Sequence, residues 1–80
     1  MVEFYGDSCA PCRAMGPILD ALSKDVKVVK VNTSEATEVT DYYRIDFLPS
    51  IILFKDGEVA EMVTGVQSKK KLLDLIEQNR

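Results

Sequence analysis

Histidine and tryptophan are absent from this chain, and its 80 residues include only two cysteines, Cys9 and Cys12. A structural zinc site usually needs four cysteine or histidine ligands, so one copy of the chain cannot complete such a site. Small secreted domains that depend on disulfides usually carry at least four cysteines. We therefore predict a redox-active pair that binds no metal, with a zinc site shared between two chains as the alternative.

Charge and hydropathy exclude further classes of function. The net charge at pH 7 is −3, whereas nucleic-acid-binding domains usually carry a strong basic excess, so we expect no nucleic-acid partner. The chain has no run of about 18 apolar residues that would predict a membrane span. Its N-terminus lacks the basic segment and apolar run of a secretory signal, so we expect a cytoplasmic protein. Its length predicts one domain over residues 1–80.

Glycine, proline and polar clusters divide the chain into alternating strands and helices. Apolar residues with helical spacing and β-branched runs predict the types of these segments. Strands are predicted at Val2–Tyr5, Val26–Val31, Ser50–Phe54 and Glu58–Thr64, and helices at Ala10–Lys24, from an N-cap at Ser34 through Tyr43, and after an N-cap at Ser68. This β-α-β-α-β-β-α order predicts an α/β fold with a mixed sheet, because a helix joins the first two strands and an Asp56-Gly57 turn joins the last two.

The Cys9-Ala10-Pro11-Cys12 motif falls just after the first predicted strand, where the first helix begins. A thiolate is the species that attacks a disulfide. The N-terminus of a helix stabilises a thiolate with unpaired N–H groups and a partial positive charge. We therefore predict that Cys9 has a lowered pKa and attacks the substrate, and that Cys12 resolves the mixed disulfide. An inert disulfide or two unreactive thiols is the alternative.

Several separated motifs of the chain resemble those of the thioredoxin family. Residues 2–13 are similar to the family's central strand and W-C-G-P-C-K active site, and Pro17 matches the proline that kinks its active-site helix. Residues 47–50 resemble the family's G-I-P-T motif, residues 54–59 its F-K-N-G-E-V hairpin, and Gly65 the glycine before its last helix. The resemblance implies a thioredoxin-like fold. Since the chain begins at the central strand, we expect a minimal version with a four-stranded sheet flanked by three helices.

The resemblance implies a thiol–disulfide oxidoreductase that reduces protein disulfides and uses no cofactor beyond the Cys9–Cys12 pair. We expect a monomer that receives electrons from a thioredoxin reductase. A glutaredoxin-like, glutathione-dependent enzyme is the second hypothesis, although the C-P-Y-C and Gly-Gly-Asp motifs of glutaredoxins are absent. A non-catalytic module that binds partners near Pro49 is the third, and the intact cysteine pair argues against it. Because Tyr5, Ser8 and Ala10 depart from the family motif, the family's redox potential does not transfer to this chain.

The same resemblance implies a substrate-binding surface beside the cysteines. Pro49 matches the family's cis-proline, which faces the disulfide, and the Leu48 backbone would pair with an extended substrate segment. A trans-proline that opens a strand is the alternative. The predicted apolar patch consists of Ala10, Pro11, Leu48, Pro49, Gly65 and Val66.

Glu3 and Lys30 match the buried aspartate of the family and its lysine partner. Burial raises the pKa of a carboxyl group, so Glu3 would accept the Cys12 proton through a water molecule. The alternative is that Glu3 lies at a frayed chain end and only pairs with a lysine.

Overall fold

The computed structural model describes every residue from Met1 to Arg80. The element order, β1-α1-β2-α2-β3-β4-α3, confirms the predicted order and the α/β class. The strands are β1 (Val2–Tyr5), β2 (Val29–Asn32), β3 (Ser50–Lys55) and β4 (Glu58–Thr64), and the helices are α1 (Ala10–Leu22), α2 (Thr37–Tyr42) and α3 (Lys69–Gln78). None of these helices is long and apolar enough to cross a bilayer.

The strands form one mixed sheet in the order β2-β1-β3-β4. β1 pairs in parallel with β2 and antiparallel with β3, as expected for a helical crossover followed by a reversal of the chain. β3 and β4 form the predicted hairpin, in which Asp56 and Gly57 both have positive φ, 54° and 82°, as a two-residue hairpin turn requires. β1 is therefore an inner strand, and its C-terminal end leads directly to the cysteine motif.

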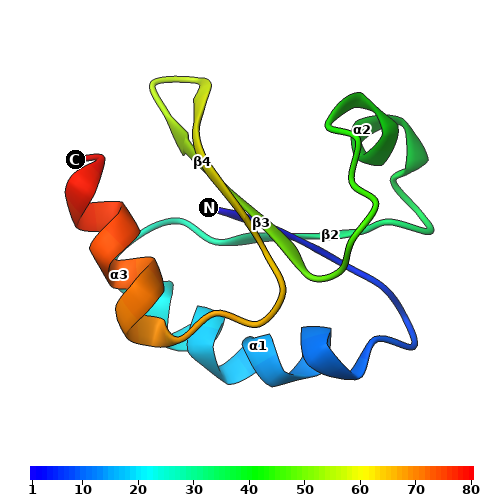
Figure 1. Cartoon of the computed structure of the whole chain (residues 1–80), viewed down its shortest axis with the longest axis horizontal. Coiled ribbons are helices and arrows are strands. Elements are labelled where there is room, and N and C mark those ends of the chain that lie inside the picture. The colour runs from blue at the N-terminus through cyan, green and yellow to red at the C-terminus, as the bar shows by residue number, and fades with distance from the viewer.

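Helices cover both faces of the sheet, with α1 and α3 on one side and α2 on the other (Figure 1). The main hydrophobic cluster lies on the α1 and α3 side and contains Met1, Met15, Leu19, Leu22, Ile51, Leu53, Leu72, Leu75 and Ile76. On the α2 side, the Phe4 ring lies 6.2 Å from the Tyr43 ring, which in turn lies 5.9 Å from the Phe54 ring. Because successive strand residues face opposite sides, Glu3 points to the α1 side and Phe4 to the α2 side.

Two boundaries near the first crossover differ from the sequence-based prediction. α1 ends at Leu22, since the amides of Asp25 and Val26 both donate to the Leu22 carbonyl and turn the chain away from the helix. β2 begins at Val29, where the backbone N–H first bonds across to the Met1 carbonyl. Residues 26–28 therefore lie outside the strand, although their composition is that of a strand and the Lys27 carbonyl accepts a hydrogen bond from the N-terminal amine of Met1 at 3.0 Å.

The predicted N-cap at Ser34 is wrong. α2 begins at Thr37, and its N-cap residue, Ala36, makes no capping side-chain hydrogen bond. The amides of Glu35 and Ala36 donate to the carbonyl of Asn32, and the amide of Ser34 donates to the Asn32 side-chain oxygen at 2.8 Å. These bonds form a turn after β2. Ser34 is part of this turn and therefore does not cap the helix.

Candidate active site

Cys9 and Cys12 are joined by a disulfide at the N-terminus of α1, with their Cα atoms 5.2 Å apart. Cys9 is the N-cap residue, and the backbone N–H of Cys12 donates to its sulfur at 3.3 Å. Pro11 lies in the first turn, where no intrahelical partner exists for an amide hydrogen. Cys9 is half-buried, whereas Cys12 is only 6% exposed. The two sulfurs therefore differ in access to solvent and in their contact with helix amides.

The loop that contains Pro49 lies beside Cys9. The Leu48–Pro49 peptide bond is cis, which confirms the prediction. A Cβ atom on Gly6 would lie 3.0 Å from Leu48 Cδ1 and 3.9 Å from Cys9 Cβ, so Leu48 and Cys9 flank this glycine closely. The carbonyl of Pro49 accepts a hydrogen bond from the amide of Gly65 at 2.8 Å. The structure thus brings three segments that are distant in sequence to one end of the sheet.

The other residues of the predicted apolar patch line the same end. Ala10 and Pro11 are exposed at the start of α1, and Val66 is exposed next to Gly65. The sequence-based patch missed Phe47, whose side chain is 58% exposed. Its ring carbon Cε1 lies 4.0 Å from where a Cβ on Gly65 would be. The sequence did contain a signal for Phe47, since it is an aromatic residue at the position of the glycine in the G-I-P-T motif.

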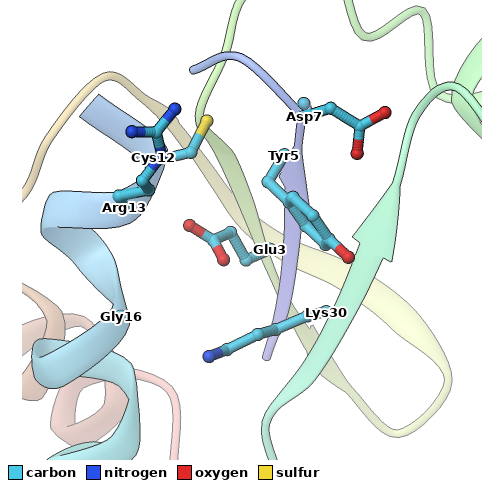
Figure 2. A pocket seen from close by; sticks show the side chains of 8 residues that line it. Glu3, Tyr5, Asp7, Cys12, Arg13, Gly16 and Lys30 are labelled. Carbon is cyan, nitrogen blue, oxygen red and sulfur yellow. The ribbon is translucent and has the colours of Figure 1, made fainter. Parts of the chain in front are cut away.

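A pocket of about 360 Å³ separates the start of α1 from β1 and β2 (Figure 2). Its lining residues are Glu3, Tyr5, Gly6, Asp7, Cys12, Arg13, Gly16 and Lys30. Glu3 is 2% exposed, and its Oε2 atom is buried without a hydrogen-bond partner in the protein. Burial raises the pKa of Glu3 above its ordinary value, and the positive charge of Lys30 partly offsets this rise. The idea that Glu3 lies at a frayed end is therefore wrong.

Lys30 lies opposite Glu3 in the pairing of β1 with β2, but its ion pair is with another acid. Lys30 Nζ is 3.5 Å from Oδ1 of Asp20 on α1. The sequence-based site missed both Asp20 and Gly16. The signal was their spacing, because Cys12, Gly16 and Asp20 recur every four residues and so lie along one side of the helix.

Hydrogen bonds tie the loop before Cys9 to the end of β2. Asn32 Nδ2 donates to Asp7 Oδ1 at 2.7 Å, and the amide and hydroxyl of Thr33 both donate to the carbonyl of Tyr5. The Asp7 carboxylate points away from Glu3 and Cys12 (Figure 2). These bonds fix the path of the chain into the cysteine motif. Asp7 and Asn32 were not predicted as site residues, since neither belongs to a motif that marks this contact.

The arrangement is suited to two-electron exchange between a protein dithiol and a disulfide. One sulfur belongs to a half-buried residue beside exposed apolar side chains, the other is enclosed, and a buried carboxyl shares a pocket with the enclosed one. The structure contains no group of three or more histidine, cysteine, aspartate or glutamate side chains that could hold a metal ion.

Comparisons with known proteins agree on one family. The thioredoxin family profile matches residues 1–78. Thioredoxin from Rickettsia bellii (strain RML369-C) is 37% identical, and the match covers 99% of this chain and 79% of that protein. Thioredoxin C-2 from Corynebacterium nephridii is also 37% identical, with 99% and 77% covered.

Among solved structures, a mutant thioredoxin from Halobacterium salinarum NRC-1 superposes with a TM-score of 0.92. It is 34% identical, and the match covers 98% of this chain and 71% of that one. Fold, cysteine pair and sequence therefore lead to the same conclusion: the chain belongs to the thioredoxin family of thiol–disulfide oxidoreductases.

Proposed function

We propose that Cys9 is the nucleophile of this oxidoreductase and that Cys12 is the resolving thiol. In the reduced protein, the Cys9 thiolate attacks one sulfur of a substrate disulfide, the substrate S–S bond breaks, and the other substrate sulfur leaves as a thiolate. Cys12 then loses its proton and attacks the sulfur of Cys9. The Cys9–Cys12 disulfide forms, the second substrate thiolate leaves, and the substrate has gained two electrons.

The observation that carries this assignment is the asymmetry of the two sulfurs. Cys9 occupies the N-cap of α1 and accepts the N–H of Cys12 at 3.3 Å, a bond that favours negative charge on sulfur. Cys12 is nearly fully buried, so an incoming protein disulfide reaches Cys9 first. An enclosed thiol is suited to an intramolecular second step, since the mixed disulfide brings its target to it.

Glu3 is proposed to accept the proton of Cys12 in that second step. Both residues line the same pocket, and burial brings the pKa of Glu3 closer to that of a thiol. A proton acceptor is most effective when its pKa lies near the working pH. Lys30 is proposed to moderate the cost of charging Glu3, because it lies opposite Glu3 in the sheet.

The proposed substrate-binding surface is the apolar patch around Cys9. Substrate would lie along the loop of Leu48 and Pro49, with the Leu48 backbone hydrogen-bonded to an extended segment. The proximity of Leu48 to Cys9 across Gly6 supports this position. The remaining members are Ala10, Pro11, Gly65 and Val66.

Proteins of the thioredoxin family act on protein disulfides and are reduced by thioredoxin reductase. We propose the same direction for this chain, as a cytoplasmic, monomeric reductant in which residues 1–80 form a single domain. This direction requires a reducing compartment, which would keep the Cys9–Cys12 pair supplied with electrons. The hydrophobic cluster, which draws on β3 and two helices, supports a single folding unit.

Cysteine-to-serine variants test the roles of the two thiols. Cys12→Ser is expected to accumulate a mixed disulfide through Cys9 with a protein substrate, which intact-mass measurement detects. Cys9→Ser is expected to form no such adduct and to lose more than about 10³-fold in reduction rate. Ser8→Ala, which leaves both thiols in place, is the control. An adduct on Cys12 in Cys9→Ser at the same rate would reverse the assignment.

The electron donor is tested in two separate assays. One contains thioredoxin reductase and NADPH, and the other contains reduced glutathione. Turnover with the reductase alone is expected. Turnover with glutathione alone would favour the glutaredoxin-like hypothesis, and no turnover with either donor would favour a binding module.

A further inference from the structure

Lys30 lies between two carboxyl groups that differ sharply in environment. Across the sheet it is in register with Glu3, whose Oε2 atom is buried without a partner. Its ammonium group nevertheless lies 3.5 Å from Asp20, whose side chain is 77% exposed. Figure 2 shows the Glu3 and Lys30 side chains both extending from the sheet toward α1. The cation in register with the buried acid is therefore paired with an acid at the surface.

Few other charged groups face Glu3. Helix α1 contributes Cys12, which is in the disulfide, together with Arg13 and Asp20, while β1 and its loop contribute Tyr5 and Asp7. Asp7 is held by Asn32, and Arg13 lies beside Cys12 at the opposite end of the pocket from Lys30 (Figure 2). On the other side of β1, the residue in register with Glu3 is apolar, Ile51.

We propose that Asp20 is a positioning residue for Glu3: it holds the Lys30 ammonium at the rim of the pocket while Glu3 is neutral, and gives it up to Glu3 when Glu3 becomes ionised. This inference rests on the proposed role of Glu3 as proton acceptor. It adds a residue on α1 that acts on Glu3 only through Lys30.

The energetics favour such an exchange. The Lys30–Asp20 pair is exposed, and ion pairs of this kind are weak because water screens both charges. A carboxylate that is buried beside the sheet is screened much less, so once charged it attracts the ammonium more strongly. Lysine has a flexible four-carbon stem, and Lys30 is already the neighbour of Glu3 in the sheet. Only side-chain rotation is needed.

Gly16 leaves space for this rotation. It lines the pocket on α1 between Cys12 and Asp20, and a Cβ atom added there would meet nothing within 4 Å. Glycine inside a helix costs about 1 kcal/mol relative to alanine. The open volume beside it belongs to the same pocket that Glu3 and Lys30 line.

The test is a titration of the Glu3 carboxyl by carbon-13 NMR in the oxidised protein. Asp20→Asn is expected to lower the pKa of Glu3 by roughly half a pH unit, since Lys30 is then free to approach it. Lys30→Met is expected to raise that pKa, and adding Asp20→Asn to Lys30→Met is expected to cause less than half of the shift seen with Lys30 present. Asp74→Asn is the matched control, because it removes an equally charged partner from Lys70 on α3.

Two results would overturn the inference. One is an Asp20→Asn shift of the same size with and without Lys30, which would mean that Asp20 acts by its own charge. The other is no shift of the Glu3 titration at all in Asp20→Asn.

A kinetic measurement separates this inference from the proposed function. If Asp20→Asn moves the Glu3 titration and the pH profile of disulfide reduction stays in place, the positioning by Asp20 stands and the catalytic role of Glu3 is wrong. If Glu3→Gln slows turnover and Asp20→Asn leaves the Glu3 titration unmoved, the catalytic role stands and the inference is wrong.

Discussion

The two faces of the sheet differ in whether their buried side chains find suitable packing or hydrogen-bond partners. On the α2 face, Phe4 is 1% exposed and packs through Tyr43 toward Phe54. On the α1 face, the neighbouring residue of the same strand, Glu3, is buried to nearly the same extent and has an oxygen without a partner. One strand therefore carries an aromatic anchor on one side and an unsatisfied acid on the other.

This difference separates the contribution of β1 to stability from its proposed contribution to the redox site. Burying apolar rings stabilises the fold, whereas burying a carboxyl group without a full set of partners destabilises it. Exceptions to good packing are expected where a protein does chemistry, and Glu3 shares its pocket with Cys12. We therefore expect substitutions on the α2 face to change stability more than redox chemistry, and substitutions at Glu3 to change both.

The largest effect is expected from Phe4→Ala, which should reduce the free energy of unfolding by about 3–5 kcal/mol, because it removes a buried ring and leaves a cavity. Urea denaturation measures this loss. Tyr42→Ala is the control: Tyr42 also contacts Tyr43, with ring centroids 4.8 Å apart, but it is 71% exposed. Its loss should be below about 1 kcal/mol.

Phe4→Leu extends this comparison to function, since a milder loss of about 1–2 kcal/mol leaves most molecules folded. The folded fraction of Phe4→Leu is expected to reduce protein disulfides at the unaltered rate. A slower rate per folded molecule would show that the two faces are not independent.

An intermediate effect is expected from Glu3→Gln, with a dependence on pH. Burial raises the pKa of Glu3 in the folded chain, so the stability that this group contributes is complete below its ordinary value of 4.5 and is lost as pH rises through the raised value. Glutamine does not ionise, so the variant does not lose this stability as pH rises. At about pH 8 it should be more stable than the unaltered chain by about 1 kcal/mol, or roughly 4–8 °C in Tm.

Thermal unfolding at several pH values checks this expectation, and the difference should disappear below pH 4.5. Glu58→Gln is the control for the change in net charge, because Glu58 is exposed on β4. A stability gain in Glu3→Gln that is constant with pH would mean that the ionisation of Glu3 does not oppose folding.

The sequence predicted those parts of the molecule that depend on local patterns. The apolar spacing of Met15, Leu19 and Leu22 predicted the buried side of α1, and the Asp56-Gly57 pair predicted the hairpin. The cysteine motif and the cis-Pro49 loop were recognisable because each is a contiguous motif.

What the sequence did not predict depends on contacts between separate segments. Serine is a common N-cap residue, but Ser34 lies in a turn in which its amide donates to the Asn32 side chain, and the helix begins later. The ion pair of Lys30 with Asp20 joins a strand to a helix, and no local pattern reports which of two acids a lysine approaches.

The smallest effect is expected from Arg44→Gly, in the loop between α2 and β3. Arg44 has φ of 54°, a left-handed conformation that costs a residue with a Cβ atom about 1–2 kcal/mol. Glycine avoids this cost, but the greater freedom of the unfolded chain returns about 0.5–1 kcal/mol, so the net gain should be up to about 1 kcal/mol by urea denaturation. Arg44→Ala removes the same charge and keeps a Cβ atom, so it should not stabilise the chain. An equal gain in both variants would assign the effect to charge, whereas a gain in glycine alone, with an unaltered rate of disulfide reduction, would show that the α2 side can be stabilised without a change at the cysteines.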